Sequence, residues 1–235
     1  MTEIASLWVG KPLTKIENTC LSSFIANGHS VTLYVYDKDM VVPRGVKKQN
    51  ANDIINHSEL FIVDNSYGPF ADLFRYKMIQ QTGMTWTDTD NICLRDDWDF
   101  GEYLFGEQGG GHGLCANGIL KSPANSHFIN DLVSSAEAFD RSKITWGEIG
   151  PQMMTSTLKK YNLEKFIQPP ETFFPIHYWE WKQLWSAQDL NSVLERTKNS
   201  HTIQIWNQMG NRNNIDKNNL PSGSIVDYYY RRFCK

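Results

Sequence analysis

The sequence lacks the segments and patterns that mark several classes of protein. No apolar run approaches the roughly 18 residues that a membrane-spanning helix needs. The first residues lack the basic-then-apolar form of a signal peptide, so we expect a cytoplasmic protein. The cysteines are far apart and contain no C-x-x-C pair, which argues against a zinc site or a disulfide framework. They are Cys20, Cys93, Cys115 and Cys234.

The sequence also lacks a large excess of either acidic or basic residues. The 235 residues carry a net charge of −3, without the strong basic excess expected of a nucleic-acid-binding protein. The sequence contains no internal repeat and no linker, and we expect one domain over residues 1–235, which is long enough to bury a sizeable core. Aromatic residues, in contrast, make up 13% of the chain. Core packing explains most aromatic residues, but such an excess also suits a site that stacks sugar rings or a base.

The first part of the chain has a β-α-β order. Strands are predicted over residues 4–9 and 31–36, with a helix over residues 14–26 between them. This order predicts a right-handed crossover and parallel pairing, and ligands of open sheets bind beyond the carboxyl ends of the strands. We therefore expect Trp8, at the end of the first strand, and Asp37, after the second, to face one crevice.

Further helices and strands follow in alternation. Helices are predicted over residues 50–57, 72–82, 126–139 and 151–161 and from residue 223 onward, and strands over residues 84–87, 115–120 and 202–206. The glycine-rich stretch at residues 109–113 is not followed by the Gly-Lys-Ser/Thr of a phosphate loop. A flexible lid and a plain surface loop are both compatible with that stretch.

The helix expected over residues 72–82 has clear signals at its ends. Pro69 suits an early helical position, and Gly83 can end the helix in a left-handed conformation. Asp72 and Arg75 are three residues apart, so they share one face of this helix. The two residues of that face come shortly before the next polar motif in the sequence.

Two acidic residues, Asp88 and Asp90, follow a short predicted strand and precede the apolar run that starts at Ile92. In an extended chain, residues two apart project to the same side, so these carboxylates should converge. Paired carboxylates repel each other unless a cation lies beside them, and their oxygens suit Mg²⁺ or Mn²⁺. The alternative is an ordinary surface turn. The acids interrupt a buried segment, where unpaired charge is costly. We therefore favour the interpretation that these carboxylates bind a ligand.

The run Asp72-Leu73-Phe74-Arg75-Tyr76-Lys77, with Gly83-Met84-Thr85-Trp86-Thr87-Asp88-Thr89-Asp90, resembles the signature of the DXD-motif sugar transferases. This family includes initiating mannosyltransferases, α-1,4-glycosyltransferases, capsular polysaccharide transferases and, more distantly, glucosylating clostridial toxins. Further similar segments extend the resemblance in order over nearly the whole chain. They are residues 6–13, 27–29, 33–36, 146–147, 150–151, 205–207 and 221–224.

The resemblance implies a GT-A fold, which is a Rossmann-like α/β fold with a mixed central sheet flanked by helices. It also implies a nucleotide-diphospho-sugar donor, a divalent metal, and transfer that retains the anomeric configuration. By the same resemblance, Asp72 and Arg75 would bind the donor sugar, and Trp8 would lie near the nucleobase. Asp88 would contact the ribose or sugar and assist the metal, and Asp90 would ligate the metal directly.

The closing strand departs from the family pattern. Many relatives have a histidine in an H-x-W motif that reaches the metal, and this chain has Gln204 at that place. Glutamine offers a neutral oxygen, which is a weaker ligand, and His201 is expected on the opposite side of the strand. The metal ligands that we predict are therefore Asp88, Asp90 and Gln204.

Two other segments have alternative interpretations. Asn117 resembles a family asparagine near the donor sugar, but it also suits an ordinary strand end. The aromatic and basic tail at residues 228–233 suits either a peripheral contact with an anionic membrane or a terminal helix that packs its aromatics. We favour the packed helix.

These features together predict a metal-dependent glycosyltransferase. It would move a UDP- or GDP-linked sugar to a hydroxyl of a glycan or lipid-linked acceptor, with Asp88, Asp90 and Arg75 as catalytic residues. One alternative is a sugar nucleotidyltransferase, although residues 9–12 are too short to supply its glycine-rich basic signature. Another is a carbohydrate-binding protein without catalytic activity.

Overall fold

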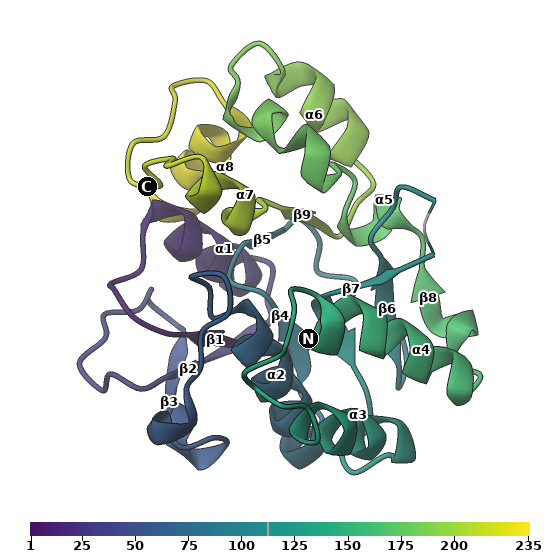
Figure 1. Ribbon diagram of the computed structural model, residues 1–235. Coiled ribbons are helices and arrows are strands. Elements are labelled where there is room, and N and C mark those ends of the chain that lie inside the picture. Colours follow the sequence, from purple (N-terminus) through teal and green to yellow (C-terminus); the bar gives the residue numbers. More distant parts are fainter. Residues whose placement is uncertain (112) are drawn as a thin grey trace.

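A seven-stranded sheet runs through the molecule in the computed structural model, which describes residues 1–111 and 113–235 (Figure 1). His112, in the glycine-rich stretch, lies outside the described residues. The strand order of this sheet is β3-β2-β1-β4-β7-β6-β8, and β5 pairs with β9 in a second sheet. The strands are β1 (Glu3–Trp8), β2 (Ser30–Val35), β3 (Lys47–Asn50), β4 (Thr85–Thr87), β5 (Asn91–Cys93), β6 (Leu104–Glu107), β7 (Cys115–Lys121), β8 (Ile167–Gln168) and β9 (Thr202–Gln204).

The sheet is mixed. Strand β1 pairs in parallel with β2 and β4, as does β2 with β3. Strand β7 is antiparallel to both β4 and β6, and β6 is parallel to β8. The predicted α/β fold with a mixed central sheet flanked by helices is therefore confirmed, as is the parallel pairing of the first two strands.

Helices cover both faces of this sheet. Neighbouring residues of β1 point to opposite faces, because side chains alternate along a strand. Ile4 packs in the core beneath α1, with Phe24, and Ala5 packs in the core beneath α2, with Phe74. The helices are α1 (Lys15–Ala26), α2 (Gly68–Thr82), α3 (His127–Glu137), α4 (Met153–Lys160), α5 (Pro170–Phe173), α6 (Leu190–Thr197), α7 (Asn207–Arg212) and α8 (Ile225–Cys234).

A third core joins the two ends of the chain. Ile16 of α1 packs there with Ile92 of β5, Ile203 of β9 and Val226 of α8. Figure 1 shows α6, α7 and α8 gathered at the end of the molecule where β5 and β9 lie. This core therefore holds the C-terminal segment against the first helix.

The terminal helix α8 packs aromatic side chains, as we favoured. Tyr229 is only 5% exposed, and its ring stacks on Phe233 with 5.9 Å between the centroids. Across the described residues, no helix combines the length and the apolar character needed to cross a bilayer.

Helix α2 confirms the predicted end signals. Pro69 lies in its first turn, and Gly83 ends it in the left-handed region, with φ at 68°. The helix begins four residues earlier than predicted, at Gly68. Its buried face carries Asp72 and Arg75 toward the carboxyl end of β4.

Three further predicted elements differ from the structure. The helix expected over residues 50–57 is a pair of 3-10 turns, since Asn50 and Asn56 each accept a hydrogen bond from the backbone N–H two residues on. The helix expected from residue 151 is preceded by a π-helical turn, Glu148–Gln152, which includes Pro151, and α4 itself begins at Met153. The strand expected over residues 202–206 ends at Gln204, since the left-handed backbone of Trp206, with φ at 58°, turns the chain into α7.

Candidate active site

A cleft of about 740 Å³ lies beyond the carboxyl ends of β1 and β4. Open α/β sheets bind ligands at this edge. All of the residues predicted for the site line this cleft, although they come from separate parts of the chain. They are Trp8, Asp72, Arg75, Asp88, Asp90, Asn117 and Gln204.

One predicted neighbour of the crevice lies elsewhere. Asp37 is exposed, and its Oδ1 accepts a hydrogen bond from the backbone N–H of Asp39. It is not among the described residues that line the cleft. The carboxyl end of β2 therefore contributes less to the cleft than the β-α-β order predicted.

Arg75 is the centre of one wall. Its guanidinium is 3.1 Å from Asp88 Oδ1 and 3.4 Å from Asp72 Oδ1, and it also donates to the carbonyl oxygen of Asn117. The group lies 4.9 Å from the centre of the Trp86 ring. Burial lowers the pKa of Arg75, but Asp88 and Asp72 raise it by more, so the net pKa lies above its usual value. Arg75 is therefore a permanent, buried cation held by two acids.

Asp72 is held within the same network. Asn117 Nδ2 donates to Asp72 Oδ1 at 3.1 Å and to the Tyr76 hydroxyl at 2.7 Å. A Cβ added to Gly150 would lie 2.5 Å from Asp72 Oδ2, so this close approach requires glycine. Burial raises the pKa of Asp72 to about 6, although Arg75 and Asn117 oppose the change.

Asp88 and Asp90 both face the cleft, but not from an extended strand, so the predicted backbone was wrong. Strand β4 ends at Thr87, and the backbone N–H of Asn91 turns back to the carbonyl oxygen of Asp88 at 3.3 Å. The N–H of Asp88 donates to Gly118 O of β7 at 2.9 Å. A turn anchored on β7, rather than strand alternation, brings the two carboxylates together.

Asp90 is the more buried of the two acids. Only 7% of the residue is exposed, and its Oδ2 accepts a hydrogen bond of 2.8 Å from the backbone N–H of Asn207. Burial, and then the neighbouring Asp88 carboxylate, raise the pKa of Asp90 to about 7. A bound cation would favour the ionised form.

Gln204 brings an oxygen toward the acids from β9, where it lies opposite Asn91. Its Oε1 is buried and has no hydrogen-bond partner among the described residues. A Cβ added to Gly118 would lie 2.9 Å from this oxygen and 3.4 Å from Asp88 Oδ2. Both oxygens therefore face the gap above Gly118, and this donor set of two carboxylates and an amide fits Mg²⁺ or Mn²⁺.

Histidine and cysteine take no part in this donor set. Within the described residues, no group of three or more His, Cys, Asp or Glu residues could hold a metal ion. His201 points elsewhere, and its Nε2 is 3.5 Å from Asp97 Oδ1. A metal at this cleft would therefore depend on the glutamine oxygen and on oxygens of its own ligand or of water.

Several residues of the cleft were missed by the sequence analysis. Asn207 and Lys217 come from the segment after β9, and Trp146 and Tyr178 lie at exposed positions, 40% and 39% accessible. Asn207 and Trp146 had a usable signal, because they lie in segments 205–207 and 146–147, which resemble the family. Lys217 and Tyr178 lie outside those segments and reach the cleft only through the fold.

Trp8 lies at the end of β1, as predicted. Its ring Nε1 donates to the carbonyl oxygen of Lys11 at 2.6 Å, and Lys217 Nζ is 5.5 Å from the ring centre. The loop after β1 thus holds this ring at the edge of the cleft. An aromatic face next to a cation suits a base or a sugar.

The sequence is similar to known glycosyltransferases. Residues 122–235 match the family described as the alpha 1,4-glycosyltransferase conserved region. The chain is 24% identical over 183 residues to lactosylceramide 4-alpha-galactosyltransferase of Mus musculus, with 70% of this chain and 47% of that protein covered. It is 25% identical over 177 residues to alpha-1,4-N-acetylglucosaminyltransferase of Homo sapiens, with 70% and 49% covered. The chain thus spans about half the length of the curated relatives it matches.

A solved structure has the same fold. The PaToxG glycosyltransferase superimposes with a TM-score of 0.52 at 16% identity, with 97% of this chain and 87% of that chain covered. At this level of identity the likeness concerns the fold. The resemblance found in the sequence is confirmed: the chain has a GT-A fold and is similar in sequence to the α-1,4-glycosyltransferases.

Proposed function

We propose that this protein is a metal-dependent glycosyltransferase. It moves a sugar from a nucleotide-diphospho-sugar to a hydroxyl of a glycan or lipid-linked acceptor, with retention of the anomeric configuration. The observation that carries the proposal is the meeting of Asp88, Asp90 and Gln204 oxygens in one cleft, next to the buried cation Arg75. The kinship with α-1,4-glycosyltransferases supports it.

Asp88, Asp90 and Gln204 are the residues that would hold Mn²⁺ or Mg²⁺. When bound, the ion would neutralise negative charge that grows on the departing diphosphate. The unpaired Oε1 of Gln204 supports this assignment, because buried polar atoms are otherwise nearly always hydrogen-bonded. The hydrogen bond from Asn207 leaves Asp90 with one oxygen, Oδ1, free for a ligand.

The residues on the α2 wall hold the donor in place. Arg75 and Asp72 present polar groups to the sugar, and Asn117 supports both of them. Their contacts with one another are made within the protein, and groups held in this way help to position the donor for transfer. Trp8 offers its ring to the nucleobase from the end of β1.

Transfer would proceed on one face of the sugar. The bond between the anomeric carbon and the diphosphate oxygen breaks, a bond to the acceptor oxygen forms, and the acceptor proton passes to the departing phosphate. The acceptor would enter past Trp146 and Tyr178, whose exposed rings suit the apolar faces of sugars. Because the matched relatives are named for different sugars, we leave the donor as a UDP- or GDP-linked hexose or N-acetylhexosamine.

A panel of nucleotide-sugars with Mn²⁺ tests the proposal, with slow hydrolysis of the donor measured by mass spectrometry. One donor should be hydrolysed in the presence of metal and not after chelation. Asp90→Asn should lower this hydrolysis by ~100-fold or more, the size of effect seen when one stabilising group is removed from a transition state. The matched control is Asp97→Asn, since Asp97 is an exposed acid paired with Arg95. Full hydrolysis by Asp90→Asn would reject the proposal.

A carbohydrate-binding protein without catalytic activity is the second candidate, and the exposed rings at the cleft favour it. Such a protein would bind a glycan with no need of nucleotide or metal. We expect instead that UDP and Mn²⁺ together raise the melting temperature and that neither does so alone. Stabilisation by an oligosaccharide alone, with none from UDP and Mn²⁺, would favour the second candidate.

A further inference from the structure

Glu17 is a buried acid that the proposed transfer does not use. It lies in the first turn of α1 and is fully buried, at 0% exposure. Its Oε2 accepts a hydrogen bond of 2.8 Å from the backbone N–H of Thr14, and the Thr14 hydroxyl also donates to it. These contacts form a capping box, which needs only this one oxygen of the carboxylate.

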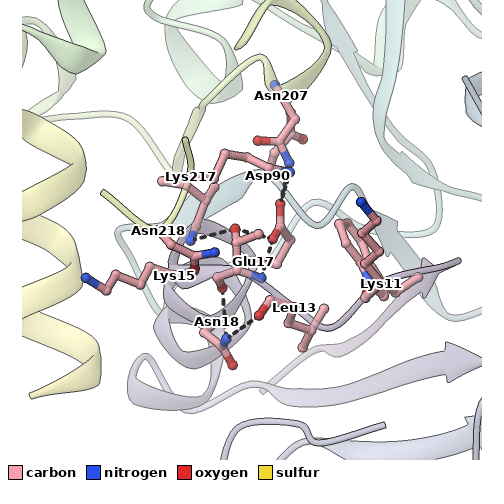
Figure 2. Close-up of polar contacts among 12 residues, drawn as sticks. Lys11, Leu13, Lys15, Glu17, Asn18, Asp90, Asn207, Lys217 and Asn218 are labelled. Atoms are coloured by element: carbon pink, nitrogen blue, oxygen red, sulfur yellow. Dashed lines mark hydrogen bonds and ion pairs between the residues drawn. The ribbon is translucent and has the colours of Figure 1, made fainter. Parts of the chain in front are cut away.

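The other oxygen of Glu17 binds the far end of the chain. Oε1 accepts from Asn207 Nδ2 at 2.8 Å and from Lys217 Nζ at 2.7 Å. Figure 2 shows Asn207, Lys217 and Asp90 gathered around Glu17. A helix cap does not require partners 190 and 200 residues away, so these contacts serve a second purpose.

Both partners of Glu17 lead to the cleft. Asn207 donates its backbone N–H to Asp90 Oδ2, and the left-handed backbone of Trp206 directs that N–H. Lys217 lines the cleft with its side chain only 13% exposed, and its Nζ lies over the Trp8 ring. One carboxylate therefore connects the start of α1 to a predicted metal ligand and to a cation at the predicted base site.

An ionised carboxylate at this depth is unfavourable unless it is paired and fully hydrogen-bonded. Asn207 and Lys217 supply the necessary donors, so they are held at Glu17 rather than free to move in solvent. The backbone of the segment between them is thereby tied to α1 at both ends.

We propose that Glu17 is a positioning residue: through Asn207 and Lys217 it fixes the segment 206–217 in the arrangement that binds the divalent cation and the nucleotide diphosphate. This inference rests on the proposed function. Glu17 touches neither ligand, and its effect is expected in their affinity rather than only in protein stability.

The test is Mn²⁺ binding to the full chain, measured by electron paramagnetic resonance with and without UDP. Glu17→Gln has only one side-chain oxygen, which can serve either the Thr14 cap or the pair Asn207 and Lys217, but not both. We expect ~10-fold weaker Mn²⁺ binding, as for other groups that orient a metal ligand. Thr14→Ala is the matched control, because it weakens the same capping box and leaves Oε1 in place. Its Mn²⁺ affinity should match that of the wild type.

Asn207→Ala gives an independent readout. It removes the link to Glu17 but keeps the backbone N–H that binds Asp90, and we expect a similar ~10-fold loss. The double variant should bind Mn²⁺ no more weakly than Glu17→Gln alone, since the Asn207 side chain acts through Glu17. If Glu17→Gln does not fold, the Mn²⁺ affinity of Asn207→Ala alone decides whether Glu17 is a positioning residue.

Two outcomes separate the inference from the proposed function. If the wild type binds neither Mn²⁺ nor UDP with Mn²⁺, the proposed function fails. If the wild type binds them and Glu17→Gln equals Thr14→Ala, or Asn207→Ala equals the wild type, the positioning role is overturned. In that case Glu17 acts only as a helix cap.

Discussion

The two walls of the cleft differ in how their polar groups are paired. On the α2 wall, Arg75 contacts two carboxylates and a carbonyl oxygen, so its charge is balanced within the protein. On the β9 wall, Gln204 Oε1 and Asn207 Oδ1 are buried with no partner among the described residues, and on the α2 wall the same holds for Asn117 Oδ1, although the charges there are balanced. Buried oxygens are seldom left unpaired, so the β9 wall is where a ligand has most to add. The α2 wall instead provides a rigid frame, formed by the contacts among Arg75, Asp72, Asp88 and Asn117.

The largest effect should come from breaking the frame. Arg75→Met leaves Asp72 buried beside Asp88 without the cation, and we expect a loss of about 3–5 kcal/mol in the free energy of unfolding. Urea denaturation measures it. Arg95→Met is the control, because Arg95 forms an exposed ion pair and its removal should lower the free energy of unfolding far less. Equal losses would mean that Arg75 is not the centre of the frame.

The pH dependence of stability tests the frame at Asp72. Burial raises its pKa to about 6 in the folded protein, above the usual value of 3.8. The contribution of protonated Asp72 to the free energy of unfolding is therefore complete below pH 3.8. This contribution is lost as the pH rises through 6. Compared with Asp72→Asn, the wild type should lose on the order of 3 kcal/mol between pH 4 and pH 7.

The measurement is urea denaturation of both proteins at several pH values. The pKa of Asp90 is also raised, to about 7. Its contribution to the pH dependence of stability is present in both proteins and cancels in the difference. Parallel pH curves for the wild type and Asp72→Asn would show that Asp72 is solvated and not part of a rigid frame.

The β9 wall is tested by changing the unpaired oxygen. Gln204→Leu keeps similar volume but has no ligand atom, and we expect about tenfold weaker Mn²⁺ binding by calorimetry in the presence of UDP. Gln204→His should bind Mn²⁺ at least as well as the wild type if the ring fits beside Gly118. Unchanged affinity in Gln204→Leu would remove Gln204 from the metal site.

The smallest effect is expected at the mouth of the cleft. Trp146→Ala removes one exposed ring, and we expect a loss of about 1 kcal/mol, or roughly fivefold in acceptor KM, with kcat little changed. Trp179→Ala is a matched control, because Trp179 is 49% exposed and stacks on His177 outside the described cleft lining. Acceptor kinetics compare the two, and equal effects would mean that Trp146 does not contact the acceptor.

Local patterns in the sequence determined much of the fold. The β-α-β order predicted parallel pairing of β1 and β2, and Pro69 and Gly83 marked the ends of α2. The spacing of Asp72 and Arg75 placed them on one helix face, and the motif with Asp88 and Asp90 placed two acids at the end of a strand. These predictions worked because helix caps, the spacing of residues on one helix face and short motifs depend on neighbours in the chain.

The tertiary structure alone decided how the cleft is completed. Asp88 and Asp90 meet because Gly118 of β7 anchors the turn between them, and Asp90 takes its hydrogen bond from Asn207, which is 117 residues away. Glu17 forms part of a helix cap, yet its second oxygen holds Lys217. No local pattern predicts such contacts, because they form only when the third core brings the C-terminal segment onto α1 and burial forces each polar group to find a partner.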